Sequence, residues 1–420
     1  MKRTLLTMAL ALAMFSGAKA QTVLPLLPSA HGLTTNQPAY NAGQTYTLTE
    51  GWNWWSTGMN LGSNSTTTLR EALTTNASVI KSQTNSTYYE EGIWGGEISE
   101  IVNTQMYMIK MTNDASFTLS GECPAQNNIQ ITAQNGWTWI SYPCTDNKSV
   151  NTALASYTGG GVIKSQDGSS YYDEQTEEWV GSLASMTPGL GYKLYNSTGA
   201  AVSFTYPAVA RDYEKTEAPL ATNWDVNYQN FATNMTMLAT AKLFGENVEG
   251  DNYEIGAFAG NECRGSIRLM QVKGREPYYA FLTIMGNDSE SIQFRLLNHE
   301  TSEVFVANNR QTYSTDAIVG SLNEPYILNF NTLMSNDEFM AGKMDMFPNP
   351  VKRDGMLTLS IPALSKNMKV QVINSLGMVV KSENMSAEKA NLSVNLAPGV
   401  YTVKVVAGDK QLYVEKLIVE

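Results

Sequence analysis

Histidine, cysteine and charged side chains are scarce in this chain of 420 residues, which holds two histidines, three cysteines and 16% charged residues. His31 lies in a polar stretch near the N-terminus, and His299 is expected in a surface turn. A Ser–His–Asp triad would have to recruit His299, and no H-E-x-x-H, G-x-S-x-G, P-loop or G-x-G-x-x-G motif is present. We therefore predict that the protein is not an enzyme and uses no cofactor.

Positive charge is also in short supply. The chain has 28 Lys and Arg residues against 39 Asp and Glu residues, which gives a formal net charge of -11. Nucleic acids and anionic lipid surfaces both attract proteins through a basic footprint. The composition therefore argues against nucleic acid as a partner and against adsorption to an anionic membrane.

Long apolar runs are missing except at the N-terminus. Lys2 and Arg3 precede an apolar stretch at residues 5–15, and Ala18-Lys19-Ala20 resembles a cleavage site. The stretch is too short for a membrane anchor, which needs about 20 apolar residues. We predict a signal peptide at 1–20, a flexible segment at 21–44, export through the inner membrane, and no transmembrane segment in the mature chain.

The few cysteines are compatible with export, which permits disulfides. Cys123 and Cys144 flank two expected strands, NIQITA and GWTWISY. If these strands form a hairpin, their ends meet and the two sulfur atoms can form a bond. Cys263 has no second Cys or His nearby, so a small buried thiol is expected there and a metal site is not.

What the chain has in abundance is Thr, Ser, Asn, Gly and Tyr, a mixture typical of β-structure with polar turns. It also contains an internal repeat. GWNWWS begins at residue 51 and GWTWIS at 136, while VIKSQ begins at 79 and again at 162. Further matches follow in the same order, which indicates a tandem duplication of a unit of about 85 residues.

Each copy shows a Trp-rich strand, a short helix, a VIKS strand, a Tyr pair, a loop to a Trp and a closing strand. We predict an all-β, multi-domain protein of β-sandwich or Ig-like modules, with short helices in the two tandem repeats. The expected boundaries are repeat copies at 45–122 and 123–208, a linker at 209–222, a β-sandwich at 223–335 and a C-terminal module at 344–420.

The repeated aromatics suggest a ligand-binding surface. Trp52 and Trp54 share one face of a strand, as do Trp137 and Trp139, which favours a place in the core. The remaining rings lie beside acidic, turn-rich segments, where aromatic faces can stack on sugar rings while carboxylates and amides bind the hydroxyls. The candidate binding residues are Tyr88, Tyr89, Trp94, Tyr171, Tyr172 and Trp179. The alternative is that these rings only close the edge of each domain.

The third unit is expected to be an antiparallel β-sandwich built from alternating strands such as NMTMLATAKL, YYAFLTIMG and SIQFRLL. Its segment at 250–265 contains Asp251, Glu254 and Glu262, and these acids could contribute oxygens to a calcium ion. Their spacing matches no EF-hand, however, and solvated surface acids are the simpler interpretation. We expect no metal site.

The C-terminal region has the most specific motifs. It begins with Phe347, Pro348, Asn349, Pro350 and Val351, continues with a turn at Gly377, and ends with the group Leu396, Gly399 and Tyr401 and a strand that includes Lys416. In this order the elements resemble the type A C-terminal sorting domain of the type IX secretion system. Asn374 departs from that family, in which Asp is common, although Asn also tolerates turn geometry. The resemblance implies an Ig-like sandwich, passage across the outer membrane by the type IX secretion machinery, and a final place at the cell surface or in the medium.

These observations favour a non-catalytic binding protein or adhesin that recognises glycan or a host surface protein through the duplicated modules. A structural surface or stalk protein without a ligand is the first alternative. A carboxylate-dependent glycoside hydrolase is the second, because such an enzyme needs only two suitably spaced acids.

Overall fold

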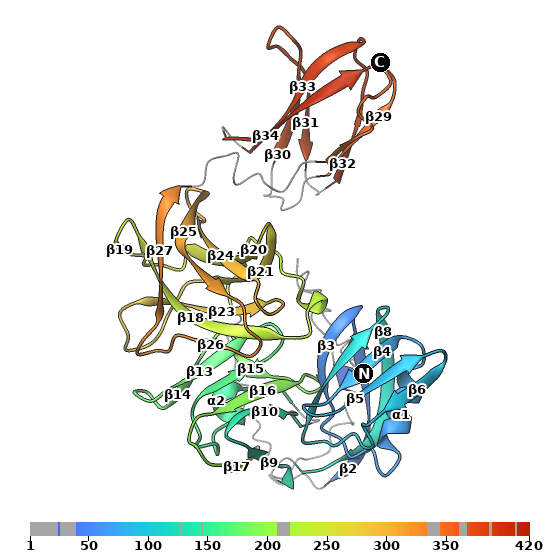
Figure 1. The fold of residues 1–420 in the computed structure, drawn as a ribbon, viewed down its shortest axis with the longest axis vertical. Coiled ribbons are helices and arrows are strands. Elements are labelled where there is room, and N and C mark those ends of the chain that lie inside the picture. Colours follow the sequence, from blue (N-terminus) through green and yellow to red (C-terminus); the bar gives the residue numbers. More distant parts are fainter. Residues whose placement is uncertain are drawn as a thin grey trace, which may run out of the picture.

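The computed structural model describes residues 24–25, 39–125, 128–143, 146–207, 219–333, 345–360, 368–385, 389–407 and 410–420. The signal peptide, Cys144 and most of the predicted linker lie outside these residues. The described chain is all-β, with two α-helices, and forms four modules (Figure 1). The first and second modules lie side by side, and the third lies between this pair and the tail domain.

The first module (24–25 and 39–123) contains a two-layer arrangement of strands and one helix. One layer pairs β2 with β8, and β1 adds to β2. The other layer is a five-stranded sheet of order β3-β7-β4-β5-β6. The bounds are β1 (Leu24–Pro25), β2 (Tyr40–Leu48), β3 (Gly51–Ser56), α1 (Ser65–Leu73), β4 (Ala77–Lys81), β5 (Ser86–Glu90), β6 (Ile93–Gly96), β7 (Met106–Met111) and β8 (Ala115–Cys123).

The second module (128–207) repeats this arrangement. When the strands of each five-stranded sheet are numbered in the order in which the chain forms them, the two sheets have the same spatial order. Its five-stranded sheet has the order β10-β16-β12-β13-β14, and β9 pairs with β17. The bounds are β9 (Gln130–Ala133), β10 (Gly136–Ile140), β11 (Lys148–Ser149), α2 (Val150–Ala153), β12 (Val162–Lys164), β13 (Ser169–Asp173), β14 (Glu178–Gly181), β15 (Ser185–Met186), β16 (Tyr192–Asn196) and β17 (Val202–Thr205). The helix predicted in each repeat is confirmed as α1 and α2.

The expected hairpin between NIQITA and GWTWISY is wrong. β9 and β10 follow one another in the chain but pair with β17 and β16, in different sheets. The chain turns between them at Gly136, whose φ of 86° suits glycine, and the first module turns in the same way at Gly51. Cys123 is nevertheless disulfide-bonded, and Cys263 is a free cysteine.

The third module (219–333) is one large sheet that curls until β21 lies against β23. The predicted alternation is confirmed, since Met235, Ile292 and Phe294 all belong to its core. The expectation of purely antiparallel pairing is wrong, because β18 pairs in parallel with β26 and β27. The bounds are η2 (a 3₁₀ helix, Tyr228–Asn230), β18 (Asn234–Leu243), β19 (Glu246–Asn247), β20 (Tyr253–Ala259), β21 (Glu262–Arg268), β22 (Met270–Gln271), β23 (Tyr278–Met285), β24 (Ser291–Asn298), β25 (Glu303–Thr312), β26 (Ile318–Val319) and β27 (Tyr326–Leu333).

The tail domain (345–420) is a small two-sheet sandwich around one apolar core. Its sheets have the orders β28-β29-β32 and β31-β30-β33-β34. The bounds are β28 (Asp345–Phe347), β29 (Met356–Ser360), β30 (Met368–Ile373), β31 (Val379–Met385), β32 (Lys389–Ser393), β33 (Gly399–Ala407) and β34 (Lys410–Val419). Within the described residues of all four modules, neither helix has the length and apolar character needed to span a bilayer.

Candidate functional site at the junction of three modules

The first and second modules are joined by a reciprocal pair of glutamines from the repeated phrase VIKSQ. Gln166 of the second module donates to the Trp52 carbonyl at 2.8 Å and accepts from the Trp54 amide at 3.0 Å. Gln83 of the first module makes the same two bonds to the Trp137 carbonyl, at 2.8 Å, and the Trp139 amide, at 2.9 Å. Each glutamine side chain thus completes the backbone hydrogen bonding of the other module's Trp strand.

The backbone contacts between these two modules follow the same reciprocal pattern. The Ser56 amide donates to the Gly189 carbonyl, and the Ser141 amide donates to the Thr104 carbonyl. An added Cβ at Gly191 would lie 2.8 Å from the Met106 Cβ, so the close approach requires glycine. A self-complementary contact of this kind is the arrangement found in two-fold symmetric dimers, here within one chain.

The tryptophans 52, 54, 137 and 139 do share faces, but the prediction that these faces form each module's own core is wrong. In the first module the core tryptophan is Trp55, which has no exposed surface. Trp54 packs instead on the outer face of the sheet with Met106 and Met108, and its indole nitrogen donates to the Ala232 carbonyl at 2.9 Å. The outer faces are the surfaces on which the modules meet.

The third module covers the outer face of the second module's sheet. The covered face is a single cross-strand row, in which Trp137 pairs with Tyr195, Tyr195 with Val162, Val162 with Tyr171, and Tyr171 with Val180. All five side chains belong to, or pack against, one apolar cluster that also contains Leu238, Tyr279 and Phe281 of the third module. A bidentate ion pair between Arg275 and Asp173 lies at the edge of this contact, with N–O distances of 2.8 and 2.9 Å. The Arg275 hydrogen bonds hold the pKa of Asp173 below its usual range.

Two buried lysines and one carboxylate form the polar centre of the same contact. Lys164 and Lys193 approach Asp316 Oδ1 at 2.8 and 2.7 Å, and both ammonium groups lie over tryptophan rings. Burial lowers the pKa of Lys164 to about 7 and also lowers the pKa of Lys193. Burial alone would raise the pKa of Asp316, but the two ammonium groups bring it below its ordinary value.

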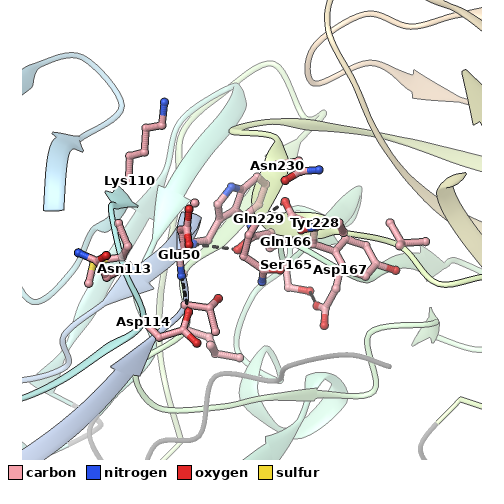
Figure 2. Close-up of a pocket in the computed structure, with 18 of the residues that line it drawn as sticks. Glu50, Lys110, Asn113, Asp114, Ser165, Gln166, Asp167, Tyr228, Gln229 and Asn230 are labelled. Atoms are coloured by element: carbon pink, nitrogen blue, oxygen red, sulfur yellow. Dashed lines mark hydrogen bonds between the residues drawn. The ribbon is translucent and has the colours of Figure 1, made fainter. Parts of the chain in front are cut away.

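A cavity of about 960 Å³ lies where the first three modules meet (Figure 2). Its lining combines polar and apolar surface in similar amounts and comes from the β2–β3 and β7–β8 turns of the first module, the VIKSQ turn of the second, and the segment before β18 in the third. The lining residues are Thr49, Glu50, Gly51, Trp54, Lys110, Met111, Asn113, Asp114, Ser165, Gln166, Asp167, Leu190, Gly191, Asp225, Val226, Asn227, Tyr228, Gln229 and Asn230.

The cavity walls are fixed by hydrogen bonds and by one close backbone approach. The Glu50 amide donates to Asp114 Oδ1 at 2.8 Å, and the Ser165 hydroxyl donates to Asp167 Oδ1 at 2.7 Å. A side chain at Gly51 would collide with the Gln229 carbonyl, so glycine lets η2 seat against β3. Figure 2 shows Lys110 extending away from the other labelled side chains. The amides and carboxylates that remain face a space large enough for several sugar rings or a short peptide.

The predicted binding residues of the second module are not available as a stacking surface. Tyr171 is 4% exposed and packs on Phe281 of the third module, and Trp179 is 7% exposed in the core of its own module. Trp179 stacks with Tyr157, and Tyr172 packs edge-on against it. The sequence does not show that the third module docks over Tyr171, or that the loop before Trp179 returns this ring to the core of its own module. For Tyr171 and Trp179 the prediction of exposed rings is wrong.

The first module is different. Tyr88 is 43% exposed on the outer face of the sheet. Tyr89 and Trp94 are half-buried and pack against each other, with their ring centroids 5.3 Å apart. The row that corresponds to the covered one contains Trp52, Lys110, Val79, Tyr88 and Gly95, which pair in that order across the strands. Of the six predicted binding residues, Tyr88 is therefore the one whose ring the structure leaves broadly open.

Sequence reasoning missed the residues that join the modules, namely Gln83, Gln166, Lys164 and Asp316. The repetition of VIKSQ was the available indication for the glutamines, because it contains three polar residues that neither strand formation nor a core requires. Nothing in the sequence around Asp316 pointed to its role.

In the acidic segment at 250–265, the protein itself supplies the partners of Glu254. Glu254 is fully buried, and its carboxylate accepts from the amides of Asn223 and Trp224 and from the Ser266 hydroxyl. It also contacts His299 Nε2 at 2.7 Å, so His299 is half-buried and paired instead of a free surface residue. Within the described residues, no group of three or more His, Cys, Asp and Glu side chains is arranged to hold a metal ion.

In the tail domain, the opening motif is joined to the last strand. The Asn349 side chain donates to the Lys416 carbonyl at 2.7 Å and accepts from the Ile418 amide at 2.9 Å. The buried Val351 forms a parallel bridge to Val419, and its amide donates to the Ile418 carbonyl. The motif therefore pins the first segment of this domain to its last strand.

The other motif residues of the tail form turns and part of the core. Asn374 Oδ1 accepts from the amides of Leu376 and Met378, and Gly377 has a φ of 79°. Leu396 and Tyr401 pack against the core, and the Tyr401 hydroxyl donates to the Ala397 carbonyl. Phe347 is 53% exposed, and Pro348 and Pro350 follow cis peptide bonds, while Gly399 begins β33. The Asn at 374 thus makes the turn that the family's Asp was expected to make.

No curated protein matches the chain by sequence. Among solved structures, it aligns with a biofilm-associated protein BSP domain at 10% identity and a TM-score of 0.17, covering 91% of this chain and 66% of that one. It also aligns with PorZ, a surface component of the type IX secretion system of Porphyromonas gingivalis, at 13% identity and a TM-score of 0.19, covering 81% and 56%. The dimeric latent PorU of the same organism aligns at 12% identity and a TM-score of 0.17, covering 90% and 31%. These scores are too low to relate the folds.

The family comparison concerns the tail domain alone. Residues 345–420 match the model of the secretion system C-terminal sorting domain. Such a domain implies interaction with the type IX secretion machinery and export to the cell surface or the extracellular space. The chain therefore ends in a member of the type IX secretion C-terminal sorting domain family, as its motifs predicted.

Proposed function

We propose that this protein is a non-catalytic adhesin that binds glycan in the cavity where its first three modules meet. The observation that supports the proposal is the composition of that cavity. Carboxylates and amides from three modules surround one space of about 960 Å³, with the half-buried Tyr228 in the lining. Such groups bind sugar hydroxyls, and an aromatic ring can contact the sugar's CH groups.

A rigid scaffold without a ligand is the second candidate. The reciprocal glutamines and the buried Lys164–Asp316 pair favour it, because they fix the relative positions of three modules. The same rigidity also suits binding, since a cavity formed between modules keeps its shape only if the modules do not move.

The experiment is a glycan and mucin binding array with the full chain. Its cavity variant is Asp225→Ala with Asn230→Ala, which removes one exposed carboxylate and one exposed amide from the lining. The matched control is Glu246→Ala with Asn247→Ala, which removes the same two groups from the exposed strand β19. We expect binding by the wild type and the control, and a loss of about tenfold or more in the cavity variant.

Two results would overturn the proposal. If the folded wild type binds neither glycan nor mucin, the scaffold function stands in its place. If the cavity variant binds as tightly as the control, the ligand does not occupy this cavity. Release of a product sugar from any bound glycan would instead revive the hydrolase alternative.

A further inference from the structure

The first module presents an uncovered counterpart of the row by which the second module docks. The covered row is Trp137, Tyr195, Val162, Tyr171 and Val180, and the open row is Trp52, Lys110, Val79, Tyr88 and Gly95. Residues directly opposite one another in antiparallel strands share a face, so each row is one continuous strip of side chains.

In the second module, residues of this face bind Asp316 of the third module. Lys164 lies 4.4 Å from the Trp137 ring centroid and 2.8 Å from Asp316 Oδ1, while the Trp137 indole donates to the Asp316 carbonyl at 2.9 Å. A lysine and a tryptophan from two strands of the same sheet thus hold an aspartate residue of the third module. The ring favours the nearby ammonium group, and the ammonium group attracts the carboxylate.

The same pair recurs in the first module without its carboxylate. Lys81, which occupies the place of Lys164 in VIKSQ, lies 5.3 Å from the Trp52 ring centroid, and Lys110 lies 5.7 Å from it. No carboxylate among the described residues forms an ion pair with either lysine.

Two differences between the rows indicate what kind of molecule carries the missing carboxylate. Lys110 replaces Tyr195 and Gly95 replaces Val180, so the open row has lost two of the apolar groups against which a protein module packs. It keeps a partly exposed Trp52 and a Tyr88 that is 43% exposed. A polar ring that bears a carboxylate fits this combination, because it can stack on the aromatic groups and pair with the lysines.

We infer that the outer face of the first module, formed by Trp52, Lys81, Lys110 and Tyr88, binds an acidic saccharide of the uronate or sialate class. This deepens the proposed function and rests on it, since Lys110 also lines the cavity and places the acidic sugar next to that space. The carboxylate would take the position at Lys81 that Asp316 takes at Lys164, with Lys110 as a second cation.

The test measures binding of the full chain to polygalacturonate and polysialic acid, with dextran as the neutral chain and poly-L-glutamate as a carboxylate polymer without sugar. The variant is Lys81→Gln with Lys110→Gln. Its matched control is Lys242→Gln with Lys273→Gln, which also changes one half-buried and one exposed lysine. We expect the first variant to bind one of the acidic polysaccharides about tenfold or more weakly than the control. Tyr88→Ala should weaken the same binding.

The outcomes separate this inference from the proposed function. Tight dextran binding that only the cavity variant loses would leave the proposed function standing and overturn the acidic class. Equal binding of poly-L-glutamate would show a carboxylate site that ignores the sugar and would overturn the saccharide. Acidic polysaccharide binding that the two lysine variants share equally would place the site elsewhere. If the folded chain binds no glycan at all, both the acidic-saccharide inference and the proposed function are wrong.

Discussion

The first and second modules have sheets of the same strand order and similar sequences along their central strands, yet their outer faces have different surroundings. In the second module the outer row consists of aromatic and apolar residues and lies under the third module. In the first module the corresponding row contains Lys110 and Gly95 and is open. The two rows differ most at two positions, where Lys110 stands in place of Tyr195 and Gly95 in place of Val180, and the row with these two changes is the one left open.

The comparison also shows how a repeated sequence can serve two purposes. The glutamines of VIKSQ act identically in both modules, because each completes the Trp strand of the other. The lysines of the same phrase do not, because Lys164 has Asp316 as a partner and Lys81 has no carboxylate partner among the described residues. The phrase therefore joins the two modules symmetrically and leaves one of its lysines free for another interaction.

The largest expected effect comes from Asp316→Ala. The ion pair that this substitution removes has no counterpart in the first module. It would leave Lys164 and Lys193 buried without a carboxylate, and breaking a buried ion pair in this way costs about 3–5 kcal/mol. Urea unfolding should show the loss, and the second and third modules should become separately mobile in proteolysis. Glu249→Ala, at an exposed site, is the control, and an equal stability of the two variants would contradict this account of the contact.

The second test compares Trp179→Ala with Trp94→Ala. Trp179 is 7% exposed and packs against Tyr157 and Tyr172, so its truncation should cost about 3–5 kcal/mol of unfolding free energy. Trp94 is half-buried and should cost clearly less. Thermal unfolding of both variants gives the difference. Equal losses would mean that the two modules bury this tryptophan alike.

Much of the fold could be predicted from the sequence, and the reasons are local. Strands such as β18 and β24 alternate apolar and polar residues, and this period alone places Met235 and Phe294 in the core. The tail domain was predictable because its motif residues have fixed tasks, such as the Asn349 side chain that binds the last strand.

The contacts between modules could not be predicted in the same way. Strict alternation says which residues share a face, but it does not say whether that face meets the module's own core or another module. Trp54 and Tyr171 show the consequence, since both lie on outer faces that other modules cover. The ion pair of Lys164 with Asp316 joins residues far apart in the chain, and no local pattern encodes it.

The third test breaks the reciprocal glutamine contact one side at a time. Gln166→Ala removes a buried side chain and leaves the Trp54 amide and the Trp52 carbonyl without partners, which should cost about 1–3 kcal/mol. Gln83→Ala should cost less, because Gln83 is exposed and water can replace it. Hydrogen exchange at the Trp54 and Trp139 amides, measured in each variant, should report the loss of its own partner only. Faster exchange at both amides in both variants would show that the contact opens as one unit.

The smallest effect is a dependence of stability on pH that distinguishes Lys164 from Lys81. The pKa of Lys164 is lowered by burial to about 7, so between pH 7 and about 10 the unfolded chain holds a proton that the folded chain has released. The free energy of unfolding should therefore rise with pH, by at most about 1.4 kcal/mol per pH unit from this group. Lys164→Met should reduce the slope between pH 7 and 9, and Lys81→Met, at the matching place in the first module, is the comparison variant. Equal slopes in the two variants would mean that Lys164 is not buried as described, and the contrast between the covered and the open row would lose its electrostatic basis.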